Sequence, residues 1–435
     1  MADALNGVHT PPRALVARSK FGQRLLSFLM VLGPGLIVMV ADNDAGAVST
    51  YTEAGARFGL HLLWVLPVLL PVTYFTQEMV ARLGIATGQG YTAMIYKRFG
   101  PRWGAFSLAS LQLLNFLTLI TEFACISLAM SMLGVSPYIA VPIAAVGLLV
   151  LASTGSYRRW ERMTMALCVL DLAWFAFAFR SGAPALTVLK SAVVPSLPAG
   201  GITPGLVFIL IAVVGTTIAP WQLFFQQSCV ADKRLRFADL KWERLDTFIG
   251  ACIVIAVAGC MMLVGDAARR HGIAYTDPAQ MAVFLGESFG PVLRSGILML
   301  MVNAAVLGTA AISLASAWAY GETRGWPHSL NIGVRQAPGF YAVYALAVAV
   351  AAGIVLIPGA PLQLIIVGVQ ALAGIMLPSA IVFLQLLLND RELLGERFVN
   401  KPWNNWVNWS VVTLLFALSL VLAAQVVAPG LFPRG

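Results

Sequence analysis

The sequence predicts an all-α protein that crosses a lipid bilayer many times. Of its 435 residues, 59% are hydrophobic and 11% are charged, and the mean hydropathy is +0.83. A soluble domain of this length would be far less apolar. Stretches of about 20 apolar residues, the length that crosses the hydrocarbon core, recur from one end of the chain to the other. No long polar segment separates them, which predicts a single integral membrane domain.

Eleven apolar stretches have this length, and we expect each of them to be a transmembrane helix. They cover residues 26–50, 60–83, 104–132, 137–154, 163–180, 203–230, 245–265, 292–319, 339–357, 362–388 and 407–428. Residues 1–22 contain basic residues but neither an apolar core nor a small-residue cleavage site. They therefore predict a short cytoplasmic tail and not a signal peptide.

The basic residues predict the orientation. With the N-terminus inside, 21 of the 28 Lys and Arg residues lie in the tail and the cytoplasmic loops, as the positive-inside rule requires. An odd number of spans then places the C-terminus on the extracellular or periplasmic side of the plasma (inner) membrane. This asymmetry accounts for the net charge of +9, so binding to nucleic acid is not expected.

The first span is interrupted by polar residues at membrane depth. Residues 41–46 read ADNDAG, which places Asp42, Asn43 and Asp44 within an apolar run. A carboxylate near the bilayer centre costs roughly 2.5–3.5 kcal/mol on insertion scales, so two of them indicate a function. Gly46 allows the backbone to open and to turn carbonyl oxygens into a cavity. The segment predicts a cation site.

The sixth span repeats the pattern of the first. Both begin with Pro-Gly-Leu, at residues 34–36 and 204–206, and both continue through an apolar stretch to a break. The second break runs from Gly215 through Thr216 and Thr217 to Pro220. Five spans separate the two starts, so the halves would insert with opposite orientation, as in transporters built from inverted repeats. A proline kink with packing glycines is the alternative explanation.

These two segments resemble the signatures of the Nramp divalent-metal transporters. The first reads GPGLIVMVADNDAGAVSTYTEAGARFG, where the family has Asp-Pro-Gly-Asn, and the second reads GTTIAPWQLFFQQS, where the family has Met-Pro-His-Asn. The resemblance continues through LHLLWVLPVLLP, ARLGIATGQGY, TEFACISLA, SYRRWE and VGVQALAGIMLPSAIVFLQLLLNDRELLG, in the same order. It implies a LeuT-like fold: a 5+5 inverted repeat with broken helices 1 and 6, and an eleventh helix.

The resemblance implies a division of the chain. We expect a cytoplasmic tail at 1–22, helices 1–5 at 23–181, an extracellular loop at 182–202, helices 6–10 at 203–390, a cytoplasmic loop at 391–406, and helix 11 with an extracellular tail at 407–435. Beyond the transported ion we expect no cofactor and no obligatory protein partner. The lipid bilayer and a divalent cation are the expected partners of a monomer.

Departures from the family pattern change the expected ligands of the ion. Asp44 takes the place of the motif aspartate, and Ala219 stands where the family has a metal-binding methionine. A thioether is a soft ligand that offers little to Mg²⁺, whereas Mg²⁺ keeps several waters and prefers oxygen. The predicted site therefore suits a partly hydrated, hard cation, as in the Nramp-related magnesium transporters. Its expected members are Ala41, Asp42, Asn43, Asp44, Thr216, Thr217, Ala219 and Gln370.

The proton relay of the family is also reduced. Trp221 and Gln226 occupy its two histidine positions, Leu119 replaces one acid of span three, and span nine contains no arginine. A relay needs a chain of titratable groups, so we expect uncoupled transport by alternating access. A membrane potential would drive it with ~4.6 kcal/mol per 100 mV for a divalent ion. The remaining polar candidates along the pathway are Glu53, Glu122, Gln222 and Trp221.

Three alternatives to Mg²⁺ uptake, with Mn²⁺ as an additional substrate, stay open. One is a proton-coupled Mn²⁺/Fe²⁺ carrier with a divergent site. A second is a Na⁺-coupled carrier of organic solutes with the same fold. An intramembrane enzyme is the third, but neither HExxH nor GxSxG occurs in the sequence, so no enzymatic activity is expected.

Overall fold

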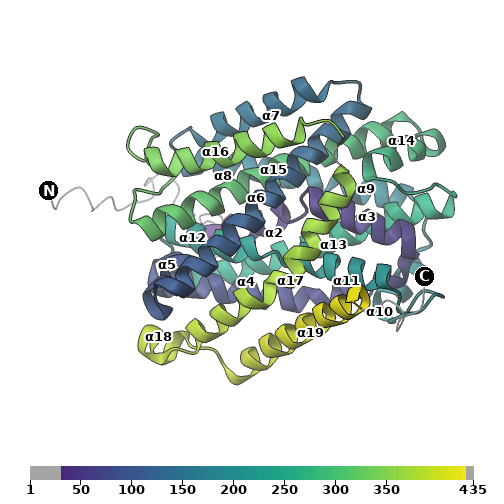
Figure 1. Ribbon diagram of the computed structural model, residues 1–435. Coiled ribbons are helices and arrows are strands. Elements are labelled where there is room, and N and C mark those ends of the chain that lie inside the picture. Colours follow the sequence, from purple (N-terminus) through teal and green to yellow (C-terminus); the bar gives the residue numbers. More distant parts are fainter. Residues whose placement is uncertain (1–30, 360, 428–435) are drawn as a thin grey trace, which may run out of the picture.

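Helices make up nearly all of the computed structural model, which describes residues 31–359 and 361–427 (Figure 1). The predicted cytoplasmic tail, the first residues of the first predicted span and the extracellular tail lie outside the described residues. The α-helices are α2 (Pro34–Ala41), α3 (Ala45–Phe58), α4 (Val65–Thr87), α5 (Tyr91–Phe99), α6 (Pro101–Met132), α7 (Pro137–Ala152), α8 (Tyr157–Asp171), α9 (Ala173–Arg180), α10 (Ala185–Val193), α11 (Pro204–Thr217), α12 (Pro220–Asp232), α13 (Leu240–Arg270), α14 (Pro278–Phe289), α15 (Pro291–Arg324), α16 (Pro338–Val355), α17 (Leu362–Leu388), α18 (Arg391–Phe398) and α19 (Pro402–Val427).

The predicted spans correspond to these helices. In the described part of the chain, eight helices or joined helix pairs are long and apolar enough to cross a membrane, and the bent pair α3–α4 adds a ninth. That pair turns by 110° and holds the end of the first predicted span and the whole of the second. The fourth predicted span is α7, a shorter apolar helix of 16 residues. The multi-pass, all-helical prediction is confirmed.

Short helices replace several connections that the sequence predicts as loops. The predicted extracellular loop at 182–202 contains α10, and the predicted cytoplasmic loop at 391–406 contains α18. Two further short helices, α5 and α14, precede α6 and α15. Hydropathy did not reveal them because they are too short or too polar to span a bilayer. The first predicted span also ends too early: α3 continues to Phe58, with Glu53 and Arg57 forming an ion pair of 2.8 Å on its last turns.

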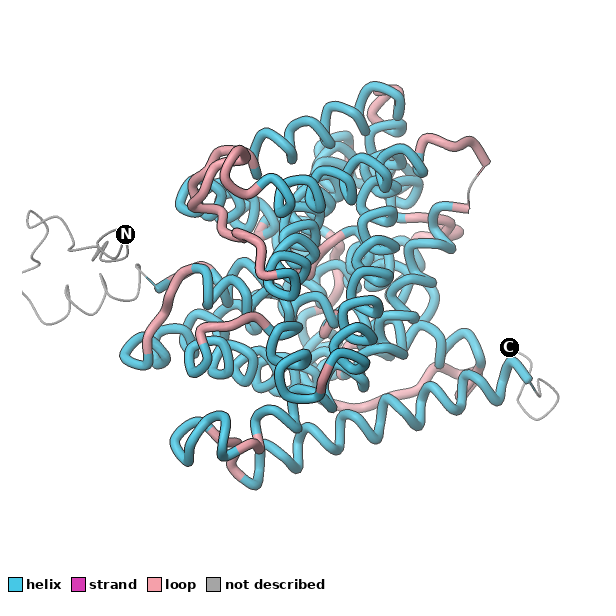
Figure 2. Tube along the Cα trace, turned by 60° about the vertical axis from the view of Figure 1, so that its left-hand side comes forward, coloured by secondary structure: helices cyan, strands magenta, loops and turns pink. Residues whose placement is uncertain are grey.

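Both predicted helix breaks are present in the interior of the bundle (Figure 2). Residues 42–44 separate α2 from α3, and residues 218–219 separate α11 from α12. Proline begins α2, α11 and α12, where its missing N–H is not needed. Helices α6, α13, α15 and α17 pack around the broken helices, while α19 lies along one outer edge of the bundle (Figure 1).

Glycines allow the central helices to approach closely. A Cβ at Gly55 of α3 would lie 2.1 Å from the Met262 carbonyl oxygen of α13. On the other side, a Cβ at Gly215 of α11 would lie 2.1 Å from the Gln370 carbonyl oxygen of α17. Small residues at such crossings are the usual means of helix association in membranes. They bring the backbone of both breaks within reach of side chains from α6, α15 and α17.

Candidate metal site

The two breaks expose backbone carbonyl groups inside the bundle. Within the described chain, the carbonyl oxygens of Ala41, Asp42 and Asn43 accept no backbone hydrogen bond, nor do those of Thr216 and Thr217. These oxygens lie at the C-terminal ends of α2 and α11, where the helix dipole is negative. Unwound carbonyls and helix C-termini are what broken transporter helices use to coordinate cations.

Asp44 lies at the centre of the first break. It is fully buried and begins α3, with its Oδ1 accepting a hydrogen bond of 3.0 Å from the Ala47 amide. Glu122 of α6 lies beside it, and its Oε2 accepts a hydrogen bond of 3.1 Å from the Ala45 amide. A Cβ at Gly308 of α15 would lie 2.8 Å from the Cβ of Asp44 and 3.1 Å from the Cδ of Glu122. Glu122 therefore belongs to the predicted site itself and not to a more distant part of a pathway.

Asp42 and Asn43 hold unpartnered polar atoms. Both side chains are buried, and no described residue makes a hydrogen bond with good geometry to either carboxylate oxygen of Asp42 or to the amide of Asn43. The Gln222 side chain of α12 is the polar neighbour of Asp42. Gln222 is held in turn by Gln77 of α4, whose Nε2 donates to its Oε1 at 3.1 Å. Gln222 thus connects the two breaks.

Gln370 approaches the first break from α17. A Cβ at Gly46 would lie 1.7 Å from its Nε2, so only glycine at this position leaves room for the Gln370 amide. The Nε2 of Gln370 and the Oγ1 of Thr216 have no hydrogen-bond partner among the described residues. Both atoms are therefore buried polar groups left without a partner at the breaks.

Thr217 has a different role from the one predicted. Its hydroxyl donates to the Val213 carbonyl and, with its hydrogen used there, accepts from the Tyr51 hydroxyl at 2.7 Å. This contact joins α11 to α3 across the two breaks. Thr217 therefore positions the broken helices through its side chain, while its carbonyl remains available.

The other predicted residues are placed as follows. Ala219 precedes α12 and is buried without any polar atom in its side chain. Trp221 is buried with its ring 6.0 Å from that of Phe225, as a packing residue would be. Glu53 is paired with Arg57 and accepts a hydrogen bond of 3.0 Å from Gln363. It contributes to packing of α3 against α17 and not to the breaks.

The two breaks offer oxygen donors of several kinds. In residues 31–359 and 361–427, no group of three or more His, Cys, Asp or Glu side chains is placed to hold a metal ion together. The oxygens available are carboxylates, amides, a hydroxyl and backbone carbonyls, and all of them are hard ligands. Oxygen ligands of this kind suit Mg²⁺, Ca²⁺ and Mn²⁺.

The residues that anchor α2 are not among those predicted from the sequence. Asp246 of α13 accepts hydrogen bonds from the Gly33 and Gly35 amides at 3.1 and 2.8 Å. Lys233 donates to the Val31 and Leu32 carbonyls, both at 2.9 Å, and pairs with Glu161 at 2.7 Å. The start of α2 is thereby tied to α12, α13 and α8.

Asp246→Ala should loosen α2. The substitution removes the acceptor of two buried N–H groups, each worth about 1.5–3 kcal/mol when the acceptor is charged. In hydrogen-exchange mass spectrometry, amides at the start of α2 should exchange at least about tenfold faster. Asp390→Ala is the matched control, because Asp390 caps α18 through the Leu393 amide at 3.1 Å. Unchanged exchange in α2 would contradict the anchoring role.

Comparison with known proteins agrees with this architecture. A sequence model of the Nramp family, described as natural resistance-associated macrophage protein-like, matches residues 35–425. The chain is 26% identical over 434 residues to the divalent metal cation transporter MntH of Staphylococcus saprophyticus, covering 93% of each. It is 28% identical over 419 residues to divalent metal cation transporter MntH 1 of Pseudomonas aeruginosa, covering 92% of each.

Solved structures show the same fold. A crystal structure of the Eremococcus coleocola manganese transporter superposes with a TM-score of 0.74 at 20% identity, covering 94% of this chain and 89% of that one. A Na⁺-coupled sialic acid symporter superposes at 0.54 with 11% identity, covering 92% and 96%. The LeuT-like prediction is confirmed at the level of the fold, and its 5+5 repeat stays a prediction. The match of the family's sequence model to most of the chain shows that this protein belongs to the Nramp family.

Proposed function

We propose that this protein is a membrane transporter that takes up Mg²⁺, and Mn²⁺ in addition, as a partly hydrated ion. The observation that carries the proposal is the set of unpartnered hard oxygen donors at the two breaks, together with Ala219 where a thioether would stand. Asp44 and the neighbouring Asp42 supply carboxylate oxygens to this site. Carbonyls from α2 and α11 complete a site that requires no soft ligand.

We further propose that the transport is not coupled to protons. A relay needs titratable groups in sequence from the site to solvent. Of the histidines in the described chain, His61 and His271 are exposed and His328 is partly exposed, all three outside the interior around Asp44. Span nine, which is α16, has no charged residue. Glu122 is a titratable group beside Asp44. A measurement of proton coupling therefore tests whether Glu122 carries a proton during transport.

A Mn²⁺ carrier is the second candidate. Its support is the similarity to divalent metal cation transporters and to a manganese transporter. The Na⁺-coupled organic solute carrier has only likeness of fold in its favour, at 11% identity. Mg²⁺ remains our proposal because the side chains at the breaks offer oxygen but neither sulfur nor imidazole.

Proteoliposomes test both parts of the proposal. The purified full-length protein is reconstituted with a Mg²⁺ dye or a pH dye inside, and a potential is imposed with valinomycin. We expect Mg²⁺ entry that rises with the inside-negative potential, competition between Mg²⁺ and Mn²⁺, and no acidification. If Mg²⁺ fails to compete with Mn²⁺, the substrate is Mn²⁺ and not Mg²⁺. Acidification that follows metal entry would show that transport is coupled to protons.

Ala219→Met should change the selectivity. The substitution adds a thioether at the start of α12, which favours Mn²⁺ over Mg²⁺ and fills the space that a hydrated ion needs. We expect the ratio of Mn²⁺ to Mg²⁺ uptake to rise about tenfold, equivalent to ~1.4 kcal/mol. Ala219→Leu is the control, since it adds similar volume without sulfur. If both variants change the ratio equally, volume and not ligand chemistry sets selectivity.

A further inference from the structure

A basic cavity lies away from the helix breaks, between α4, α13 and the segment that joins α18 to α19. Its volume is about 260 Å³, enough for a phosphate group with bound water. Four cationic residues and one acidic residue line it: Arg82, Arg244, Arg397, Lys401 and Glu78. The rest of the wall is formed by the aromatic side chains of Tyr74, Phe75 and Trp403, together with Val399 and Asn404. The cavity therefore carries a formal excess of three positive charges.

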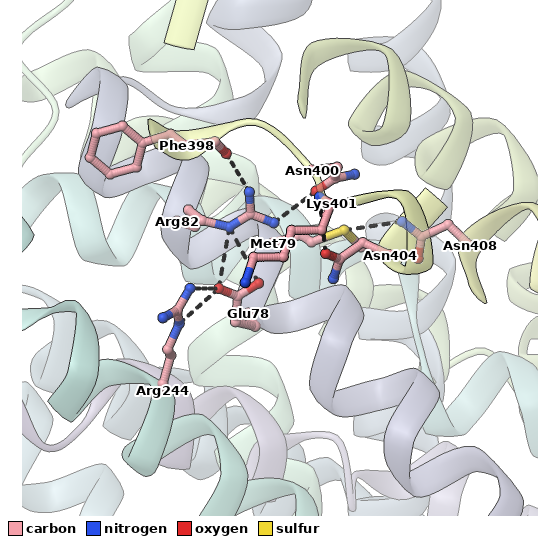
Figure 3. Close-up of polar contacts among 9 residues, drawn as sticks. All are labelled: Glu78, Met79, Arg82, Arg244, Phe398, Asn400, Lys401, Asn404 and Asn408. Carbon is pink, nitrogen blue, oxygen red and sulfur yellow. Dashed lines mark hydrogen bonds and ion pairs between the residues drawn. The ribbon is translucent and has the colours of Figure 1, made fainter. Parts of the chain in front are cut away.

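Glu78 and Arg82 form the structural base of this cavity. The Glu78 carboxylate accepts from Arg82 Nε at 3.2 Å and from Arg244 Nη2 at 2.7 Å (Figure 3). The remaining nitrogens of Arg82 donate to the Phe398 carbonyl and to Asn400 Oδ1. All of Arg82's nitrogens are therefore engaged, and one carboxylate is shared between two guanidinium groups.

Three cations remain available to a ligand. Arg244 is about half exposed and uses only its Nε and Nη2 on Glu78. Arg397 lies over the Phe237 ring at 3.5 Å, and the Lys401 side chain extends toward Glu78 (Figure 3). Within the described chain, neither Arg397 nor Lys401 has a carboxylate within ion-pair distance. Guanidinium and ammonium groups arranged in this way bind phosphate oxygens.

The aromatic residues place the cavity at headgroup depth. Trp403, Trp406 and Trp409 are 46%, 78% and 45% exposed at the start of α19, the last span. Exposed tryptophans at the end of a membrane helix mark the boundary between hydrocarbon and headgroups. The Trp403 ring packs edge-on against Phe75, with ring centroids 4.6 Å apart, at the wall of the cavity. An anion in this cavity would thus lie at the level of lipid phosphates.

We propose that this cavity binds the phosphate group of an anionic phospholipid. Arg244, Arg397 and Lys401 would contact the phosphate oxygens, and Trp403 and Phe75 would border the glycerol and the first acyl carbons. Basic pockets between membrane helices are the places where anionic headgroups bind. A phosphatidylcholine headgroup is disfavoured, because its choline cation would meet the same positive charges. A soluble phosphate shares the chemistry but would not use the aromatic wall.

Native mass spectrometry of the purified full-length protein tests the proposal. The protein, in a neutral detergent, is titrated with dioleoyl phosphatidylglycerol, with dioleoyl phosphatidylcholine, and with inorganic phosphate as a competitor. We expect phosphatidylglycerol to bind at least about tenfold more tightly than phosphatidylcholine, and millimolar phosphate to leave it bound. The variant R397Q/K401Q should weaken phosphatidylglycerol binding by about tenfold or more, since each surface cation contributes roughly a factor of five.

A charge-matched control separates this site from general surface attraction. R158Q/R159Q removes two exposed cations from the first turn of α8, far in sequence from the cavity. Both double variants keep Glu78 and Arg82, so both should keep the wild-type melting temperature in lipid-free detergent. An equal loss of phosphatidylglycerol binding in the two variants would overturn the proposal, and displacement by millimolar phosphate would overturn the lipid assignment. Neither outcome depends on which ion the protein transports.

Discussion

Asp44→Asn should reduce metal uptake by more than about a hundredfold, the largest effect expected for a single substitution in this chain. Asp44 is the negative side chain at the point where α2 gives way to α3, and its neighbours hold it in place through the Ala47 amide and Gly308. A divalent ion that enters a bilayer interior must replace part of its hydration by negative and polar groups. The asparagine keeps the shape and the cap of α3 but removes the charge.

The measurement is uptake of Mg²⁺ and of Mn²⁺ in proteoliposomes with equal amounts of folded protein. Asp171→Asn is the matched control, because Asp171 is a buried aspartate in a membrane helix that accepts a hydrogen bond of 2.8 Å from Asn303. The control should transport within about threefold of the wild type. Uptake by Asp44→Asn at the level of this control would mean that the ion does not bind at the first break.

Gly46→Ala should reduce metal uptake without unfolding the protein. The new methyl group would lie 1.7 Å from Nε2 of Gln370, so the flexible amide has to leave the break. If Gln370 supplies an oxygen to the ion, the expected loss of uptake is on the order of tenfold or more. Gly147→Ala is the control, since a Cβ at Gly147 meets no atom within 4 Å.

A double-mutant cycle makes this prediction sharper. Gln370→Ala should reduce uptake to a similar extent, and the Gly46→Ala/Gln370→Ala double variant should be no worse than either single variant. Two residues that act through one contact show such non-additivity. Additive losses would mean that Gly46 is needed only for the backbone conformation at the break. Gln370 would then be a packing residue.

Many features of the fold could be predicted from the sequence. Hydropathy located ten of the eleven spans close to the helices observed, since each span is a local property of about 20 residues. The two breaks were predicted because polar residues and Pro-Gly pairs interrupt apolar runs. The early end assigned to the first span was wrong, because the polar face of α3 is covered by α13 and α17 and not by water.

Side-chain partnerships could not be predicted in the same way. Glu122 lies 77 residues from Ala45 in the chain, yet its carboxylate binds that amide. Thr217 lies 166 residues from Tyr51 in the chain, yet their hydroxyl groups are hydrogen-bonded. The local sequence pattern does not predict which of several buried polar residues faces the break. That depends on how each helix is rotated and on close packing at glycines.

The sequence by itself therefore determined the membrane class, the two broken helices and the hard, oxygen-rich character of the donors. These follow from composition and from residues adjacent in the chain. Only the tertiary structure decided that Glu122 joins Asp44, that Thr217 holds α11 to α3, and that Glu53 is paired away from the breaks. Packing decides these points because a buried polar group takes whichever partner the neighbouring helices bring within hydrogen-bond distance.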